Sequence, residues 1–289
     1  MLSATVHVRS ANKKQTSLTG QYILRERVEI HVLLMFLYEF IRIFVVVKIG
    51  GKMANSYFRF KQFTINQERC AMKVGTDGCL LGAWADLASG RRILDVGCGS
   101  GLIAIMAAQR CAEARITGIE LDEDAASQAR ENAAASPWTE RIEIVHKDFL
   151  KYTPDEKFDT ILSNPPYFTN SLKCPDDKRA KARHDDSLAS SDLLSHAHLL
   201  LSDGGRLSVV IPAEQSETWR AQAADTGLQL TKIVYVHTRP TAAPKRVLME
   251  FTKSRECATV CETKFILEEE PGKYSEEAVR LLQPFYLKL

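Results

Sequence analysis

The residues best suited to chemistry stand together in "SNPPYF", residues 163–168, directly after a β-prone stretch. Pro165 and Pro166 fix two successive φ angles and push the residues before them into extended conformations, so this segment is rigid. The side-chain oxygen of Asn164 and the carbonyl of Pro165 are acceptors for the two protons of one amino group. Tyr167, followed by Phe168, offers a ring on which a base can stack.

An exocyclic amino nitrogen is a poor nucleophile because its lone pair is delocalised into the ring. Two acceptors favour a pyramidal nitrogen whose lone pair points at an electrophilic carbon, and a rigid frame supplies proximity and orientation. The stretch therefore predicts alkylation of a planar amino group, with no metal required. Taken alone, it is equally compatible with a Pro-Pro turn that packs an aromatic ring.

A second motif, "LDVGCGSG" at residues 94–101, follows a predicted strand and opens a predicted helix. Its glycines allow a sharp turn and a close approach of the backbone to a ligand. Glu120 ends the next strand, where an acidic side chain can bind both ribose hydroxyls. A dinucleotide site would favour Gly-x-Gly-x-x-Gly with a pyrophosphate at the helix N-terminus. Asp95 would repel a pyrophosphate and suits a cofactor with a cationic amino-acid end.

These two motifs resemble the class I methyltransferases, which use S-adenosylmethionine, and "SNPPYF" resembles the Asn-Pro-Pro-Tyr signature of those that methylate amino groups of adenine, guanine, cytosine or a glutamine amide. The resemblance implies that the glycines line the methionine and ribose, that Glu120 binds the ribose, and that Asp148 in "HKDF" reaches the adenine amino group. The cofactor-binding residues predicted here are Asp95, Gly97, Gly99, Gly101, Glu120, Asp148 and Asn164. The catalytic residues are Asn164, Pro165 and Tyr167.

The segment "RCAMKVGTDGCLLGAWADL", residues 69–87, precedes the first strand of the sheet. Thr76 and Asp77 are able to cap a helix that begins at about Cys79. This segment resembles the leader of the bacterial tRNA(Val) adenine-N6 methyltransferases, which modify adenosine 37 beside the anticodon. The C-terminal "YSEEAVRLLQPFYLKL" resembles the tail of the same family. In the wider class this leader touches the methionine end of the cofactor, which adds Lys73, Gly75, Thr76 and Asp77 to the predicted cofactor-binding residues.

Basic residues cluster after the catalytic loop and again between the last two predicted strands. Two such clusters beside one pocket indicate phosphate positioning rather than base reading, which fits a tRNA partner. The residues predicted to bind substrate are Tyr167, Phe168, Lys178, Arg179, Lys181, Arg183, Arg239, Lys245 and Arg246.

The elements that position these motifs alternate between short apolar runs and helical patterns. Such alternation predicts right-handed crossovers and a mostly parallel sheet covered on both faces. We expect a Rossmann-like α/β fold with a seven-stranded, mostly parallel sheet and an antiparallel edge hairpin. The predicted strands are 91–97, 114–121, 142–148, 158–164, 206–212, 228–239 and 246–253, and the helices are 102–113, 122–135, 187–201 and 213–227.

The chain of 289 residues has a net charge of only +2, so nucleic-acid binding has to come from local clusters. Its seven scattered cysteines favour free thiols in a reducing cytoplasm. We expect one methyltransferase domain over 53–289. Residues 1–52 form an extension with an apolar stretch at 30–47. That stretch is a membrane anchor, an extra helix, or the product of a start codon placed too far upstream, since "MANSYFRF" from Met53 reads as a beginning.

Three other functions share the central motif. A protein-glutamine methyltransferase acting on release factors normally carries a helical N-terminal domain, for which the interval from Met53 to the sheet is too short. An rRNA guanine-N2 or a DNA adenine-N6 methyltransferase is the second alternative. A non-catalytic adapter is the third, and the intact Asp95, Glu120 and Asn164 argue against it.

Overall fold

The computed structural model describes residues 55–87, 90–166, 188–254 and 259–289. Residues 56–289 form one compact unit. The predicted extension 1–52 and its apolar stretch lie outside the described residues. Within the described part of the chain, no helix is long and apolar enough to cross a membrane.

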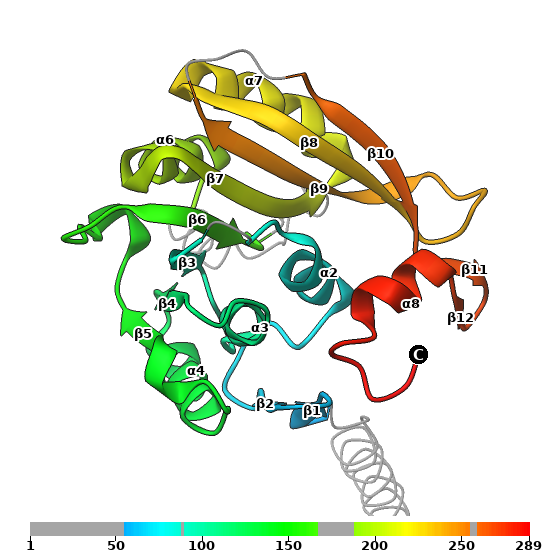
Figure 1. Ribbon diagram of the computed structural model, residues 1–289, viewed down its shortest axis with the longest axis horizontal. Coiled ribbons are helices and arrows are strands. Elements are labelled where there is room, and N and C mark those ends of the chain that lie inside the picture. Colours follow the sequence, from blue (N-terminus) through cyan, green and yellow to red (C-terminus); the bar gives the residue numbers. More distant parts are fainter. Residues whose placement is uncertain (1–54, 88–89, 167–187, 255–258) are drawn as a thin grey trace, which may run out of the picture. The chain divides into compact units, whose positions relative to one another are not determined.

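The centre of this unit is an eight-stranded sheet in the order β10-β8-β9-β7-β6-β3-β4-β5 (Figure 1). The five strands from β7 to β5 in this order pair in parallel, β9 runs antiparallel to both of its neighbours, and β10 pairs in parallel with β8. The bounds of the strands are β3 Arg92–Val96, β4 Arg115–Glu120, β5 Ile142–His146, β6 Phe158–Ser163, β7 Leu201–Pro212, β8 Leu228–His237, β9 Pro244–Lys253 and β10 Cys261–Ile266.

The seven predicted strands, the mostly parallel sheet and the antiparallel hairpin near its edge are confirmed, but the sheet has eight strands rather than seven. β10 adds an eighth strand outside β8, so the β8–β9 hairpin does not form the edge. Four of the six residues of β10 are exposed, and three of these are polar or charged, which hides the strand from a search for apolar runs. β7 is also longer than predicted, because the expected loop at 202–205 already belongs to the strand.

Helices cover both faces of the sheet, as predicted. Figure 1 shows α2 and α3 on one side and α6 and α7 on the other. Each side has its own apolar core, one built around α2 and α3 and one around α6 and α7. The helices are α2 Thr76–Trp84, α3 Leu102–Arg110, α4 Glu123–Ala134, α6 Ser190–Leu200, α7 Ser216–Thr226 and α8 Glu276–Leu282, with short 3₁₀ turns η1 Thr139–Arg141, η2 Phe149–Lys151 and η3 Ala213–Gln215.

The start of α2 differs from the prediction. The helix begins at Thr76 rather than near Cys79, with Gly75 at the N-cap and no side-chain capping bond. The carboxylate of Asp77 lies inside the first turn and is turned toward β9 instead, as described below. Thr76 and Asp77 are therefore helical residues and do not cap the helix.

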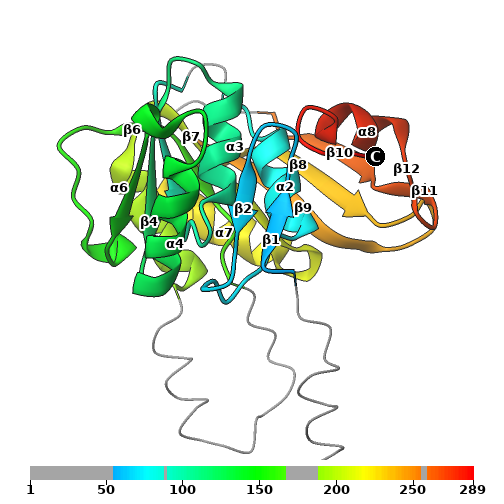
Figure 2. The ribbon, with the colours of Figure 1, turned by 90° about the horizontal axis from the view of Figure 1, so that it is seen from below.

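The leader and the tail meet at an aromatic cluster beneath α2 and α3. The hairpin β1 Tyr57–Arg59 and β2 Thr64–Asn66 contributes Phe58 and Phe60, whose rings lie 5.9 and 5.7 Å from that of Tyr286. Tyr286 also lies near Cys79 of α2, and burial raises the pKa of both side chains. Figure 2 shows α8 beside the second hairpin, β11 Glu268–Glu270 and β12 Lys273–Tyr274. Residues from the beginning and from the end of the unit thus pack together with α2 in one apolar core.

Candidate active site

The carboxyl ends of β3, β4, β5 and β6 border a cleft of about 720 Å³. Crevices at this edge of an open parallel sheet are where such folds bind ligands. Four of the predicted site residues line the cleft directly, namely Gly97, Glu120, Asp148 and Pro165. Its other lining residues are Val96, Ile119, Leu121, Asp122, Lys147, Phe149, Leu150, Lys151, Ser163, Pro166 and Leu188.

The glycine-rich turn leaves β3 and folds over β4. Gly97 and Gly99 adopt φ angles of 67° and 53°, which other residues rarely adopt. A Cβ atom at either position would find nothing within 4 Å, so these two glycines face open space. The amides of Gly97 and Cys98 donate to the carbonyl of Ile119 at 2.9 and 3.0 Å. The turn is therefore fixed to β4 on one side while its other side is open to a ligand.

Asp95 lies just beneath this turn and is fully buried. One carboxylate oxygen, Oδ2, accepts the amide of Ala104 in the first turn of α3 at 3.0 Å. The other, Oδ1, has no hydrogen-bond partner among the described residues. Burial, opposed by the Ala104 bond and assisted by Glu120, raises the pKa of Asp95 to about 7. A buried carboxylate oxygen without a partner is suited to a cationic ligand group.

Glu120 at the end of β4 is held by three backbone amides. Gly99 donates to Oε2 at 2.8 Å, and Leu121 and Asp122 donate to Oε1 at 2.9 and 3.0 Å. These bonds fix the orientation of the carboxylate and connect it to the glycine-rich turn. Because a carboxylate has about four acceptor positions, capacity remains for a ligand hydroxyl.

Asp148 follows β5 and lies at the far end of the cleft. Its carboxylate accepts the amide of Leu150 at 3.0 Å and pairs with Lys151 at 3.1 Å. Partial burial raises the pKa of Asp148, but the bonds from Lys151 and Leu150 outweigh it and leave this pKa below its ordinary value. Asp148 is therefore an ionised acceptor that is already partly engaged.

Sequence reasoning missed two apolar residues of the cleft. Leu121 and Leu150 follow the acidic ends of β4 and β5, and their exposed fractions are 52% and 41%. Exposed leucines that line a cleft offer apolar contact to a ligand. The signal was present in "ELD" and "DFL", where a leucine stands directly in the loop after an acidic strand end.

Asn164 and Pro165 leave β6 next to the glycine-rich turn. The hydroxyl of Ser163, the last residue of β6, donates to the carbonyl of Val96 at 3.0 Å. The side chain of Asn164 lies against the first turn of α2, since a Cβ at Gly78 would be 3.8 Å from Asn164 Nδ2. The predicted catalytic and cofactor residues thus come together across β3 and β6. Tyr167 and Phe168 lie outside the described residues.

The leader residues contact other parts of the protein. Lys73 Nζ donates to the carbonyl of Gln67, and the amide of Val74 donates to Gln67 Oε1 at 2.7 Å. Asp77 accepts a hydrogen bond from Arg246 Nε of β9 at 2.8 Å. Two residues predicted to bind different ligands are therefore each other's partners. None of Lys73, Gly75, Thr76 and Asp77 borders the cleft described above.

Of the residues predicted to bind RNA, Arg239, Lys245 and Arg246 are described. Arg239, on the loop between β8 and β9, and Lys245, the second residue of β9, are both exposed. Because β8 runs parallel to β7 and β6, this loop lies at the same edge of the sheet as the cleft. Lys178, Arg179, Lys181 and Arg183 lie outside the described residues.

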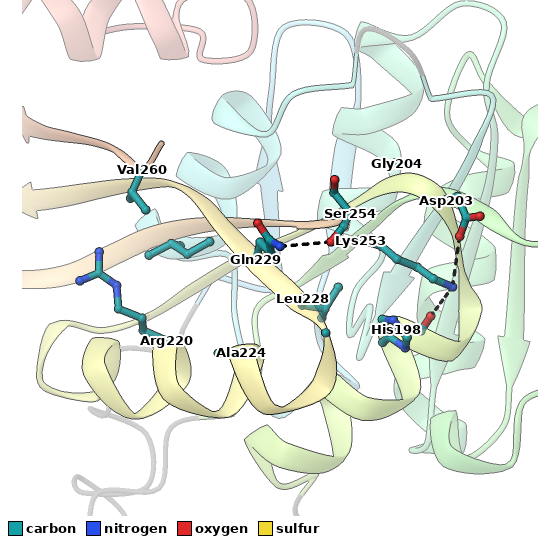
Figure 3. Close-up of a pocket in the computed structure, with 12 residues that line it drawn as sticks. His198, Asp203, Gly204, Arg220, Ala224, Leu228, Gln229, Lys253, Ser254 and Val260 are labelled. Atoms are coloured by element: carbon teal, nitrogen blue, oxygen red, sulfur yellow. Dashed lines mark hydrogen bonds and ion pairs between the residues drawn. The ribbon is translucent and has the colours of Figure 1, made fainter. Parts of the chain in front are cut away.

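A second, larger cleft of about 1290 Å³ lies at the amino ends of the parallel strands, between the ends of α6 and α7 and the start of β8. Figure 3 shows Lys253 directed at the end of α6, where Nζ donates to the carbonyls of His198 and Leu201 at 3.0 and 2.9 Å. Arg220 pairs with Glu262 at 2.7 Å. This cleft contains no predicted site residue, and these two cations are bound within the protein.

The sequence matches the model of the family "Methyltransferase small domain" over residues 76–219. A solved structure of a predicted O-methyltransferase from Agrobacterium tumefaciens has the same fold, with a TM-score of 0.55 and 24% identity over 72% of this chain and 96% of that one. This likeness confirms the predicted methyltransferase fold.

Curated relatives are much more similar. The tRNA1(Val) (adenine(37)-N6)-methyltransferase of Phocaeicola vulgatus is 49% identical over 237 residues, which is 82% of this chain and all of the relative. The protein of the same name from Trichodesmium erythraeum is 42% identical over 240 residues, again 82% of this chain and all of the relative. The resemblance predicted from the leader, the motifs and the tail is confirmed, and the chain belongs to the tRNA1(Val) (adenine(37)-N6)-methyltransferase family.

Proposed function

We propose that this protein transfers a methyl group from S-adenosylmethionine to the N6 amino group of adenosine 37 in tRNA1(Val), in the cytoplasm. The observation that carries the proposal is the meeting of two motifs at one edge of the sheet. The glycine-rich turn and the Asn164–Pro165 loop leave the neighbouring strands β3 and β6 at paired residues, Val96 and Ser163. A donor held by one motif and an acceptor held by the other would therefore be adjacent. The names of the relatives supply the tRNA and the position.

The cleft fits S-adenosylmethionine. The buried Oδ1 of Asp95, which has no described partner, suits the cationic amino-acid end of the cofactor. The open space beside Gly97 and Gly99 leaves room for its methionine and ribose groups. Glu120 offers acceptors for the ribose hydroxyls. Leu121 and Leu150 line the cleft together with Asp148, and we propose that they contact the adenine. The bound cofactor would supply a methyl group on a positively charged sulfur, which is a strong electrophile.

The chain's own residues would prepare the acceptor nitrogen. The side-chain oxygen of Asn164 and the carbonyl of Pro165 would accept hydrogen bonds from the two N–H groups of the target adenine, which localises the nitrogen lone pair and directs it at the methyl carbon. The nitrogen would bond to this carbon as the carbon–sulfur bond breaks, and it would then release one proton to solvent. Pro165 and Pro166 keep both acceptors still because their φ angles are fixed. Tyr167, and Phe168 beside it, are proposed to stack on the base once it has left the RNA stack.

The RNA itself would be held by its phosphates. Arg239 and Lys245 are exposed at the edge of the sheet that carries the cleft, where they are positioned to contact the backbone on one side of the target base. Lys178, Arg179, Lys181 and Arg183 are proposed to do so from the loop after Asn164. Asp77 and Arg246 bind each other, so we propose for them a role in fixing α2 against β9 in addition to any contact with a ligand.

The test is incubation of the full chain with labelled S-adenosylmethionine and total tRNA, followed by digestion to nucleosides. We expect label in N6-methyladenosine. Asn164→Ala should reduce transfer by about 10²-fold or more, because both the acceptor and its geometry are lost, while the cofactor Kd stays near the wild-type value. Label in protein or in methylguanosine would instead support the glutamine or guanine alternatives and refute the proposal.

A further inference from the structure

One side chain joins the two motifs of the site. Ser163 is the last residue of β6 and is almost fully buried. Its hydroxyl donates to the carbonyl of Val96, the last residue of β3, at 3.0 Å. These two residues are also partners in the sheet register. The residue after Val96 is Gly97, the first of the glycine-rich turn, and the residue after Ser163 is Asn164.

The register of β3 with β6 ends where the two motifs begin. The parallel ladder between β3 and β6 ends at the pair Val96 and Ser163. Pro165 and Pro166 have no N–H and donate no further ladder bond. On the other side of β3, the amides of Gly97 and Cys98 already donate to β4. The Ser163 hydroxyl therefore adds a bond from the β6 side just where the backbone pairing stops.

We propose that Ser163 is a positioning residue for methyl transfer, an inference that rests on the proposed function. Its hydrogen bond sets the distance and angle between the turn that holds the methyl donor and the loop that holds the acceptor nitrogen. Donor and acceptor each bind on one side of this bond, so its loss should alter their relative placement more than the binding of either. A misplacement of about 1 Å can lower a rate by roughly 10²-fold.

A direct contact with the cofactor is the competing role. Ser163 lines the cleft, so its oxygen could also accept a hydrogen bond from a bound ligand. The two roles differ in their kinetic effects. A positioning residue changes kcat with little change in cofactor Kd, whereas a binding residue changes the Kd.

The neighbouring strand provides a matched control. Ser208 of β7 pairs in register with Leu162 of β6 and is fully buried. Its Oγ has no hydrogen-bond partner among the described residues. Ser208→Ala therefore removes the same hydroxyl from the next strand of the sheet without breaking a described bond to the site.

The experiment compares the full-length wild type with Ser163→Ala, Ser163→Cys, Ser163→Thr and Ser208→Ala. Single-turnover methylation of total tRNA gives the transfer rate, calorimetry gives the cofactor Kd, and circular dichroism verifies folding. We expect Ser163→Ala to lower the rate by roughly 10- to 100-fold with an unchanged Kd. Threonine, which keeps the hydroxyl, should restore most of the rate, and cysteine, a weaker donor, should fall between. Ser208→Ala should behave like the wild type.

Three results would overturn the inference. Equal rates for Ser163→Ala and Ser208→Ala would show that the bond to Val96 does not govern transfer. A higher cofactor Kd with an unchanged rate at saturating cofactor would assign Ser163 to cofactor binding. If the transfer rates of the Ser163 variants do not decrease in the order Thr, Cys, Ala, the effect of the substitutions is not caused by the loss of the hydrogen bond. A wild type that forms no N6-methyladenosine would refute the proposed function itself, which is a distinct outcome.

Discussion

The two clefts described above lie at opposite ends of the strands of one sheet, and they differ in how the polar groups near them are used. The smaller cleft is lined by Gly97, Glu120 and the exposed Leu121 and Leu150, and the buried Asp95, whose Oδ1 has no described partner, directly precedes its lining residue Val96. The larger cleft contains Lys253 and Arg220, each bound to other groups of the protein. Volume therefore does not identify the site. Hydrogen-bonding capacity that the protein leaves unused is the better guide, because burying such a group without a partner is unfavourable.

The largest effect should follow from removing the unpartnered acceptor. Asp95→Asn keeps an oxygen for the amide of Ala104 and replaces the unpartnered oxygen by an amino group. We expect the Kd of S-adenosylmethionine to rise by roughly 10- to 100-fold, since a bond to a charged group is lost. Calorimetry measures this change. Undiminished affinity would show that Asp95 only supports α3 and would remove the difference between the two clefts.

The pH dependence sharpens the same point. Burial raises the pKa of Asp95 to about 7, whereas a bound ammonium group would favour the ionised carboxylate and lower this pKa. Binding below pH 7 must then release a proton, so the wild-type affinity should fall as the pH decreases through about 7. Asp95→Asn should lose this dependence. An affinity that is flat from pH 6 to 7.5 in the wild type would contradict the assignment.

An intermediate effect, on stability alone, is expected in the larger cleft. Lys253→Met removes the donor to two carbonyls at the end of α6 but keeps most of the apolar stem. We expect the free energy of unfolding to fall by about 1–3 kcal/mol, measured by urea titration, with an unchanged transfer rate. A reduced rate in the fully folded variant would make the larger cleft part of the functional site.

The smallest effect should come from the pair at the rim of that cleft. Arg220 and Glu262 are both partly exposed, and ion pairs of this kind contribute about 0–1 kcal/mol. Arg220→Ala should therefore change the urea midpoint only slightly, and 1 M salt should abolish the difference from the wild type. A loss that persists in high salt would indicate that packing, not charge, is involved.

The sequence was sufficient to predict the local conformation and the placement of several candidate site residues. Gly97 and Gly99 could be predicted because a turn with positive φ angles excludes other residues. Asp95, Glu120 and Asn164 could be predicted because each stands at the end of an apolar run, and strand ends in a parallel sheet share one edge. The order of strands and helices followed from the same periodicity.

What the sequence could not provide are contacts that depend on register and packing. The Ser163–Val96 bond joins residues 67 positions apart, and the Asp77–Arg246 pair joins residues 169 positions apart. Neither follows from a local pattern. β10 was missed because four of its six residues are exposed, so its sequence does not show a continuous apolar run.

The aromatic cluster beneath α2 has a consequence for biosynthesis. α2 lies against Asn164, which we propose to be catalytic, yet part of its packing comes from Phe285 and Tyr286, some two hundred residues later in the chain. A growing chain that has already produced the glycine-rich turn and Asn164 still lacks this support. The site should therefore mature only after the residues around 285 have left the ribosome, which would keep incomplete chains from capturing cofactor or tRNA.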